Sequence, residues 1–137
     1  MSRLLSIDYG EKRVGVAMTD PLKMFVTPFL TIENKSEEIL FSELLKIFNQ
    51  HDIEKVIIGL PLSTEGKNTP KTLEVQAFFK KLSKKTDLPL VWWDERYTTC
   101  EANDFLKNKG LNWRKSRDVV DQIAAAMILK SYLDDFK

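Results

Sequence analysis

The chain has 137 residues, of which 43% are hydrophobic and 30% are charged, and its formal net charge at pH 7 is +1. This length and composition predict one globular domain over residues 1–137, and they exclude a disordered or fibrous chain. The near-zero net charge excludes a global attraction to polyanions, so any affinity for nucleic acid must come from a local basic patch.

The N-terminal part of the chain is rich in strand signals. The apolar run 4–7, the turn 9–12 and the alternating segment 13–19 together predict a β-hairpin. Segment 24–32 predicts a third strand, and its Pro28 is better placed at a sheet edge than at the centre. We therefore expect the third strand to add to the outer side of the hairpin.

The middle of the chain alternates between helix and strand signals. Apolar residues recur at helical spacing just after Asn34 and Ser36, which are both candidates for the N-cap of this helix. Segment 55–61 is apolar after Lys55, as is typical of a strand buried on both faces of a parallel sheet. Pro70 suits the first turn of a second helix, and the buried apolar side of this helix is expected to carry Leu73, Ala77, Phe78 and Leu82. This order implies a parallel crossover.

The last part of the chain begins with a predicted strand over 88–93. Thr98 and Glu101 have capping-box spacing, and the helix that they start is expected to end near Gly110. After a basic loop, the apolar stripe of segment 118–132 predicts a final helix packed on the sheet. The order βββαβαβαα indicates an α/β fold with a mixed sheet.

Neither a membrane role nor a disulfide framework is indicated. No apolar run approaches the roughly 20 residues needed to cross a bilayer, and the N-terminus lacks the apolar core of a secretory signal. The single cysteine, Cys100, cannot form an internal disulfide and is interpreted as a small buried hydrophobic residue. We therefore expect a cytoplasmic protein without a membrane partner.

Three acidic residues are predicted to meet at one edge of the sheet. Asp8 ends the first strand, Glu95 follows the last strand, and Asp121 lies in the first turn of the final helix. In an open α/β sheet, ligands bind at the carboxyl ends of the parallel strands. Crowded carboxylates repel one another, and Mg²⁺ or Mn²⁺ relieves that repulsion. Two such ions roughly 4 Å apart would support hydrolysis of a phosphodiester.

Each of these acids also has a purely structural interpretation. Asp8 is a turn former whose side chain can bond the hairpin backbone. Glu95 could pair with a neighbouring arginine or a surface lysine, and Asp121 lies three residues after the candidate N-cap Asp118, where a carboxylate favours the helix dipole. Since successive strand residues face opposite sides, only one of Asp94 and Glu95 can face the site.

The segment between the capping-box helix and the final helix is a candidate nucleic-acid contact. It combines five basic residues and one aromatic residue with no acid: Lys107, Lys109, Trp113, Arg114, Lys115 and Arg117. Such a composition suits phosphate contact with base stacking. The structural alternative is a solvated loop whose tryptophan is tucked into the core.

Four linked motifs, which together extend from about Leu4 to Leu133, resemble those of the YqgF family: "IDYGEKRVGVAMTD", "GLPLSTEGKNTP", "DERYTTCEA" and "VDQIAAAMIL". Its members are described as Holliday-junction-resolvase-like proteins or as candidate nucleases of precursor 16S ribosomal RNA. The resemblance implies a ribonuclease-H-like fold with a five-stranded mixed sheet, order 3-2-1-4-5, strand 2 antiparallel and helices on both faces.

The resemblance also implies roles for individual residues. Asp8, Glu95 and Asp121 coincide with the family motifs and resemble a catalytic triad that binds two Mg²⁺ or Mn²⁺ ions. Arg13 and Arg96 resemble residues that line the nucleic-acid track. The implied function is a metal-dependent endonuclease that matures the 5′ end of precursor 16S rRNA during ribosome biogenesis. Its implied partners are this RNA and the pre-ribosome, and its expected assembly is a monomer or a weak homodimer.

Three other functions fit the sequence. A Holliday-junction resolvase would act on branched DNA, and it would need a dimer that presents two active sites. A non-catalytic nucleic-acid or ribosome-binding module would use the same acids structurally. The stretch "DYGEKRVG" is also similar to the phosphate loop of sugar kinases and actin-like ATPases, but those proteins hold nucleotide between two domains and this chain supplies one.

Overall fold

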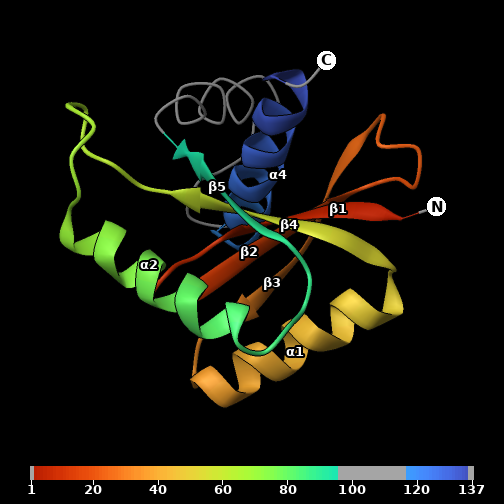
Figure 1. The fold of residues 1–137 in the computed structure, drawn as a ribbon, viewed down its shortest axis with the longest axis horizontal. Helices are drawn as coiled ribbons and strands as arrows, with labels where there is room; N and C mark the ends of the chain where they lie inside the picture. Colours follow the sequence, from red (N-terminus) through yellow and green to blue (C-terminus); the bar gives the residue numbers. More distant parts are fainter. Residues whose placement is uncertain (1, 96–116, 136–137) are drawn as a thin grey trace.

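The computed structural model describes residues 2–95 and 117–135, which form five strands and three α-helices (Figure 1). The strands are β1 (Arg3–Asp8), β2 (Arg13–Thr19), β3 (Val26–Glu33), β4 (Ile53–Leu60) and β5 (Leu90–Asp94). The helices are α1 (Glu37–Gln50), α2 (Pro70–Ser83) and α4 (Arg117–Asp135). None of these described helices has the combination of length and apolarity that a membrane span needs. The helix predicted from Thr98 to Gly110 lies outside the described residues.

All five strands belong to one sheet, in the order β3-β2-β1-β4-β5. Strand β2 is antiparallel to both of its neighbours, whereas β1, β4 and β5 are parallel. A short turn joins β1 to β2, and α2 joins β4 to β5 because a parallel connection must cross over the sheet. The predicted sheet order and strand directions are confirmed.

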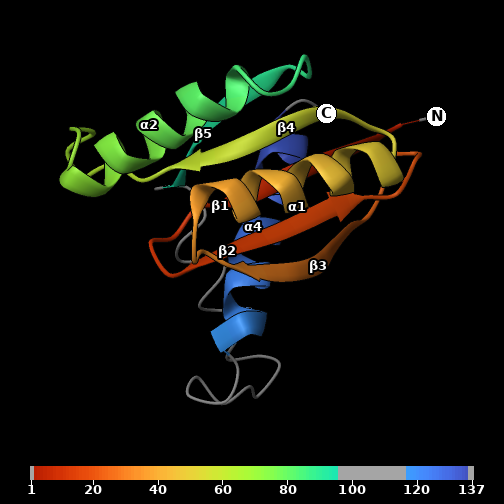
Figure 2. The same cartoon turned by 90° about the horizontal axis from the view of Figure 1, so that it is seen from below.

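The two faces of the sheet are covered by different helices. Helices α1 and α2 cover one face and α4 covers the other (Figure 2). The side chains of successive β1 residues point to opposite faces of the sheet. Leu5 and Ile7 pack with α1 and α2, whereas Leu4 and Ser6 face α4. This alternation places Asp8, the last residue of β1, on the α4 face.

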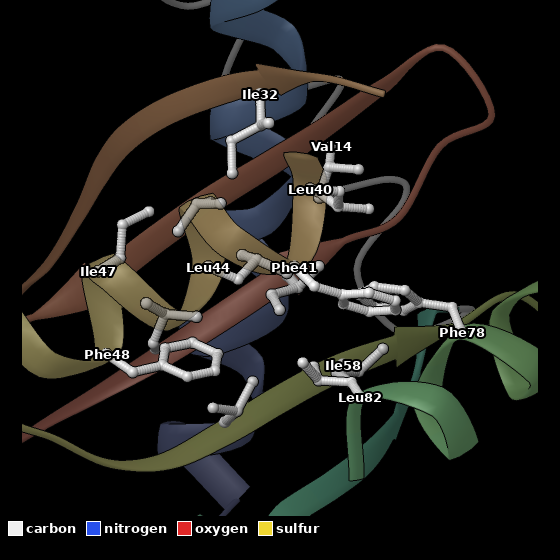
Figure 3. Close-up of a cluster of buried hydrophobic side chains, with 14 of the residues drawn as sticks. Val14, Ile32, Leu40, Phe41, Leu44, Ile47, Phe48, Ile58, Phe78 and Leu82 are labelled. Carbon is white, nitrogen blue, oxygen red and sulfur yellow. The ribbon is translucent and has the colours of Figure 1, made fainter. Parts of the chain in front are cut away.

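The larger hydrophobic core fills the space between the sheet and helices α1 and α2 (Figure 3). The helices contribute Leu40, Phe41, Leu44, Ile47, Phe48, Val75, Phe78 and Leu82. Burying each such side chain stabilises the fold by roughly 1.5–3 kcal/mol. This packing anchors α2, so its first turn is held at the C-terminal end of β4.

Side-chain caps fix where α1 and α2 begin. Ser36 caps α1, and its hydroxyl accepts a hydrogen bond from a backbone N–H of the first turn at 3.2 Å. Thr69 caps α2 in a reciprocal capping box with Thr72. The other N-cap candidate of α1, Asn34, instead donates its side-chain amide to the carbonyl of Gly10 at 2.9 Å. Asn34 therefore ties the end of β3 to the β1–β2 turn, next to Asp8.

Candidate active site

Asp8 lies between two glycines in its row of the sheet. Its partner on β2 is Gly15, and its neighbour on β4 is Gly59, which follows the Ile58 that pairs with Ile7. A Cβ atom at Gly15 would overlap the backbone carbonyl of Asp121. The two glycines therefore leave the space that other acidic groups need in order to approach Asp8.

Glu95 occupies the space above Gly59. A Cβ atom at Gly59 would lie 2.5 Å from Glu95 Oε1 and 2.6 Å from Ile128 Cδ1. On β5, Trp93 faces α4, where its ring N–H donates to Ser131 Oγ at 3.0 Å. Alternation returns Glu95 to the same face. The structure thus brings Glu95, rather than Asp94, against Asp8.

The carboxyl groups of Asp8 and Glu95 share a hydrogen bond. Burial raises the pKa of Asp8 well above its ordinary value, and the charge of Glu95 and the shared bond raise it further. Burial also raises the pKa of Glu95, although the hydrogen bond from Asp8 and the charge of Lys71 oppose that rise. The pKa of Asp8 is therefore raised more strongly than that of Glu95, and in their hydrogen bond Asp8 is the donor and Glu95 the acceptor.

Helix α4 brings Asp121 to the other side of Asp8. The Ser6 hydroxyl donates to the carbonyl of Ala125 at 2.6 Å, which fixes the helix on the sheet. Asp121 Oδ2 accepts a hydrogen bond from Arg13 Nε at 2.9 Å, and both side chains are partly exposed. The charge of Asp121 still contributes to the raised pKa of Asp8.

The three acids do not form a closed metal cage. Within residues 2–95 and 117–135, no three His, Cys, Asp or Glu side chains converge closely enough to hold one ion. Asp8 and Glu95 are the converging pair, while Asp121 lies nearby and is held by Arg13. Chemically, the arrangement is a partly buried acid pair with a third carboxylate at its rim.

A family model described as RuvX, Holliday junction resolvase, matches residues 2–135. This chain belongs to the RuvX family. Two curated relatives are both named "Putative pre-16S rRNA nuclease". The protein of Caldicellulosiruptor saccharolyticus is 39% identical over 134 residues, covering 96% of this chain and 96% of its own length. The protein of Maridesulfovibrio salexigens is 40% identical over 131 residues, covering 96% and 97%.

Solved structures similar to this RuvX-family chain include two resolvases bound to Holliday junctions. Thermus thermophilus RuvC with its junction substrate matches with a TM-score of 0.57 at 11% identity, covering 97% of this chain and 96% of that chain. The fowlpox virus resolvase with its junction DNA matches with a TM-score of 0.59 at 12% identity, covering 98% of each chain. These matches confirm the predicted ribonuclease-H-like fold.

Lys71 is a residue of the site that sequence reasoning missed. It lies in the first turn of α2, and that turn is held on β4 because the Thr72 hydroxyl donates to the carbonyl of Pro61. Its positive charge opposes the raised pKa of both Asp8 and Glu95. The signal was available: Pro70 marks the start of α2, so the next residue had to lie near the end of β4.

Most of the residues predicted to contact nucleic acid lie outside the described part of the RuvX-family chain. These are Arg96, Lys107, Lys109, Trp113, Arg114 and Lys115. Arg117 begins α4, and only its backbone is described. Arg13 is described: it stands at the start of β2, with its guanidinium bonded to Asp121.

Proposed function

We propose that this RuvX-family chain is a metal-dependent endonuclease that hydrolyses phosphodiester bonds in the 5′-end maturation of precursor 16S rRNA. The observation that carries the chemistry is the close approach of the Asp8 and Glu95 carboxyl groups at the carboxyl ends of two parallel strands. The names of the curated relatives support the choice of substrate. Such a role implies a cytoplasmic protein that meets its RNA in the pre-ribosome.

The donor set fits Mg²⁺ or Mn²⁺. Both ions prefer carboxylate oxygens, and the pair presents partly buried carboxyl groups beside two glycines. The two closely placed carboxyl groups repel each other when both are ionised, and a divalent cation bound between them would relieve that repulsion. Asp8 and Glu95 would hold the metal, with Asp121 as a further ligand once it leaves Arg13. When bound, one or two ions would activate water and stabilise the leaving oxygen.

The other charged residues of the site would orient the substrate. Lys71 and Arg13 place positive charge on opposite sides of the acid pair, where they can meet the phosphates of a bound strand. The basic segment from Lys107 to Arg117 would extend this contact along the strand. A monomer suffices for cutting one RNA strand.

Metal removal is the direct test of this proposal. Purified protein should cleave a transcript that spans the 5′ end of 16S rRNA in Mg²⁺ or Mn²⁺. Excess chelator should lower the rate by at least about 10³-fold, because metal ions supply several kcal/mol of transition-state stabilisation. Cleavage is measured on denaturing gels. Undiminished cleavage in chelator, or equal cleavage by a Glu95→Gln variant, would contradict the proposal.

Resolution of branched DNA is the second candidate, because the family description names it and the fold matches two resolvases bound to junctions. A four-way DNA junction belongs in the same assay as the RNA. Cleavage of the junction alone, by a protein that is dimeric in sedimentation analysis, would favour this candidate over the RNA nuclease.

Replacing Lys71 with glutamine should lower cleavage at pH 7 by about three- to tenfold and move the pH of half-maximal activity upward. Without its positive charge, the pKa of Asp8 and Glu95 rises further, so the pair gives up its proton to a metal at a higher pH. A pH–rate profile measures the shift. Lys80→Gln, an exposed position on the same helix, is the matched control. An unshifted profile for Lys71→Gln would show that the charge is irrelevant.

A further inference from the structure

A cavity of about 190 Å³ lies between α1 and α2. One of its lining residues is Tyr9, which directly follows Asp8 in the sequence. The cavity is lined by an aromatic group and a charged group: Tyr9, Phe41, Phe78, Glu37, Glu74 and Lys81. The cavity is smaller than the roughly 300–1,000 Å³ of pockets for drug-sized ligands. A single planar ring system suits its size.

Three aromatic rings form a stack along the cavity. The rings of Tyr9 and Phe78 lie 4.5 Å apart at an angle of 25°, and those of Phe78 and Phe41 lie 5.8 Å apart at 5°. Figure 3 shows the Phe41 and Phe78 rings face to face. Both phenylalanines are buried, whereas Tyr9 is only partly buried. A stack of this kind that ends in an accessible ring offers a surface on which a nucleobase can stack.

The charged rim complements one edge of one base. The ammonium of Lys81 donates a hydrogen bond to Glu37 Oε1 at 2.6 Å. The side chain of Glu74 makes no hydrogen bond or ion pair with any residue in the described ranges. Two glutamates disfavour a phosphate at this rim. A carboxylate beside an ammonium matches the Watson–Crick edge of guanine, which presents two adjacent N–H donors and a carbonyl acceptor. Adenine, cytosine and uracil do not present that pattern.

Helix α2 links the cavity to the candidate active site, because it carries residues of both. Lys71, Glu74, Phe78 and Lys81 are spaced three, four and three residues apart, so they share one face of the helix. Lys71 acts on Asp8 and Glu95, and the other three line the cavity. A strand whose phosphate lies at Lys71 can therefore place a neighbouring base over Tyr9.

We propose that this cavity binds the guanine base of a nucleotide that flanks the scissile phosphate. The proposal rests on the nuclease function above. Tyr9 supplies the stacking surface, Glu74 accepts from the guanine N–H groups, and Lys81 donates to the guanine carbonyl. The nuclease therefore prefers cleavage sites with a guanine at this position.

Binding without cleavage tests the proposal. Fluorescein-labelled ten-nucleotide RNAs that carry one guanine, inosine or adenine in a uridine background are titrated with protein in chelator, and anisotropy gives Kd. Wild type should bind the guanine RNA at least about fivefold tighter than the adenine RNA. This ratio is the lower end of the discrimination between bases that one bidentate contact provides. Inosine, which lacks the amino group, should fall between them.

Glu74→Gln should abolish this preference, because glutamine replaces an acceptor oxygen with a donor. Glu43→Gln, an exposed change of equal charge that lies outside the cavity, should keep the preference. Equal binding of the guanine and adenine RNAs by wild type, or an unchanged preference in Glu74→Gln, would overturn the proposal. If wild type binds the guanine and adenine RNAs equally but still shows metal-dependent cleavage, only the base pocket is refuted. A guanine preference without cleavage of any RNA refutes the nuclease alone.

Discussion

Replacing Asp8 with asparagine should lower metal-dependent cleavage by at least about 10³-fold and should at the same time raise the free energy of unfolding at neutral pH. The activity falls because the amide cannot provide the charge that holds the metal, which supplies several kcal/mol in the transition state. The stability rises because a buried carboxylate with a raised pKa is replaced by a neutral group of the same shape. Cleavage gels and denaturant unfolding measure the two effects.

The pH dependence follows from the direction of the shift. Since the pKa of Asp8 is higher in the folded protein than in the unfolded chain, the folded state binds more protons between those two values. The free energy of unfolding therefore falls as pH rises through that window, by about 1.4 kcal/mol for each unit by which the pKa is raised. Asp8→Asn should flatten this decline. Asp87→Asn, at an exposed turn, should leave it in place. If Asp8→Asn were fully active or less stable than wild type, the proposed role of Asp8 in the site would be contradicted.

Replacing Gly15 with alanine should lower the free energy of unfolding by about 1–3 kcal/mol and reduce cleavage by up to about 100-fold. The added Cβ would overlap the backbone carbonyl of Asp121, and a backbone atom has no rotamer through which to escape. Helix α4 must therefore move away from β2, which displaces Asp121 from Asp8. Thermal or denaturant unfolding measures the first effect, and the cleavage assay the second.

Gly59→Ala is the matched comparison for Gly15→Ala. Its Cβ would meet the ends of the Glu95 and Ile128 side chains, which can rotate. This variant should lose less stability than Gly15→Ala but should lose activity, because Glu95 is pushed off Asp8. If Gly15→Ala were as stable and active as wild type, the close approach of α4 would have no functional meaning.

The sheet order could be predicted because strand signals and turn lengths are local properties of the sequence. Helix orientation was harder to predict. Leu73 was expected on the buried side of α2, yet its side chain is 58% exposed, and Val75 is buried instead. The contact of Thr72 with the carbonyl of Pro61 sets the rotation of α2. The spacing of apolar residues along the sequence does not predict that tertiary contact.

The acid pair was accessible to sequence reasoning, but the features that complete the site were not. Asp8 and Glu95 each follow a recognisable strand, so their meeting follows from sheet topology. The part played by Gly15 and Gly59 depends on strand register, which places them beside Asp8. The part played by Lys71 depends on how α2 docks on β4.

The contact of α4 with Gly15 sets a minimum distance between this helix and β2. Most helix–sheet contacts are made by side chains, which can adjust to temperature and to substitution. Here the backbone of α4 at Asp121 packs directly against the backbone of β2 at Gly15. The spacing between β2 and the N-terminal part of α4 around Asp121 is therefore insensitive to repacking further along the helix. Engineering for heat resistance can accordingly alter the apolar layer around Leu129 and Tyr132 without changing the separation of Asp8 and Asp121.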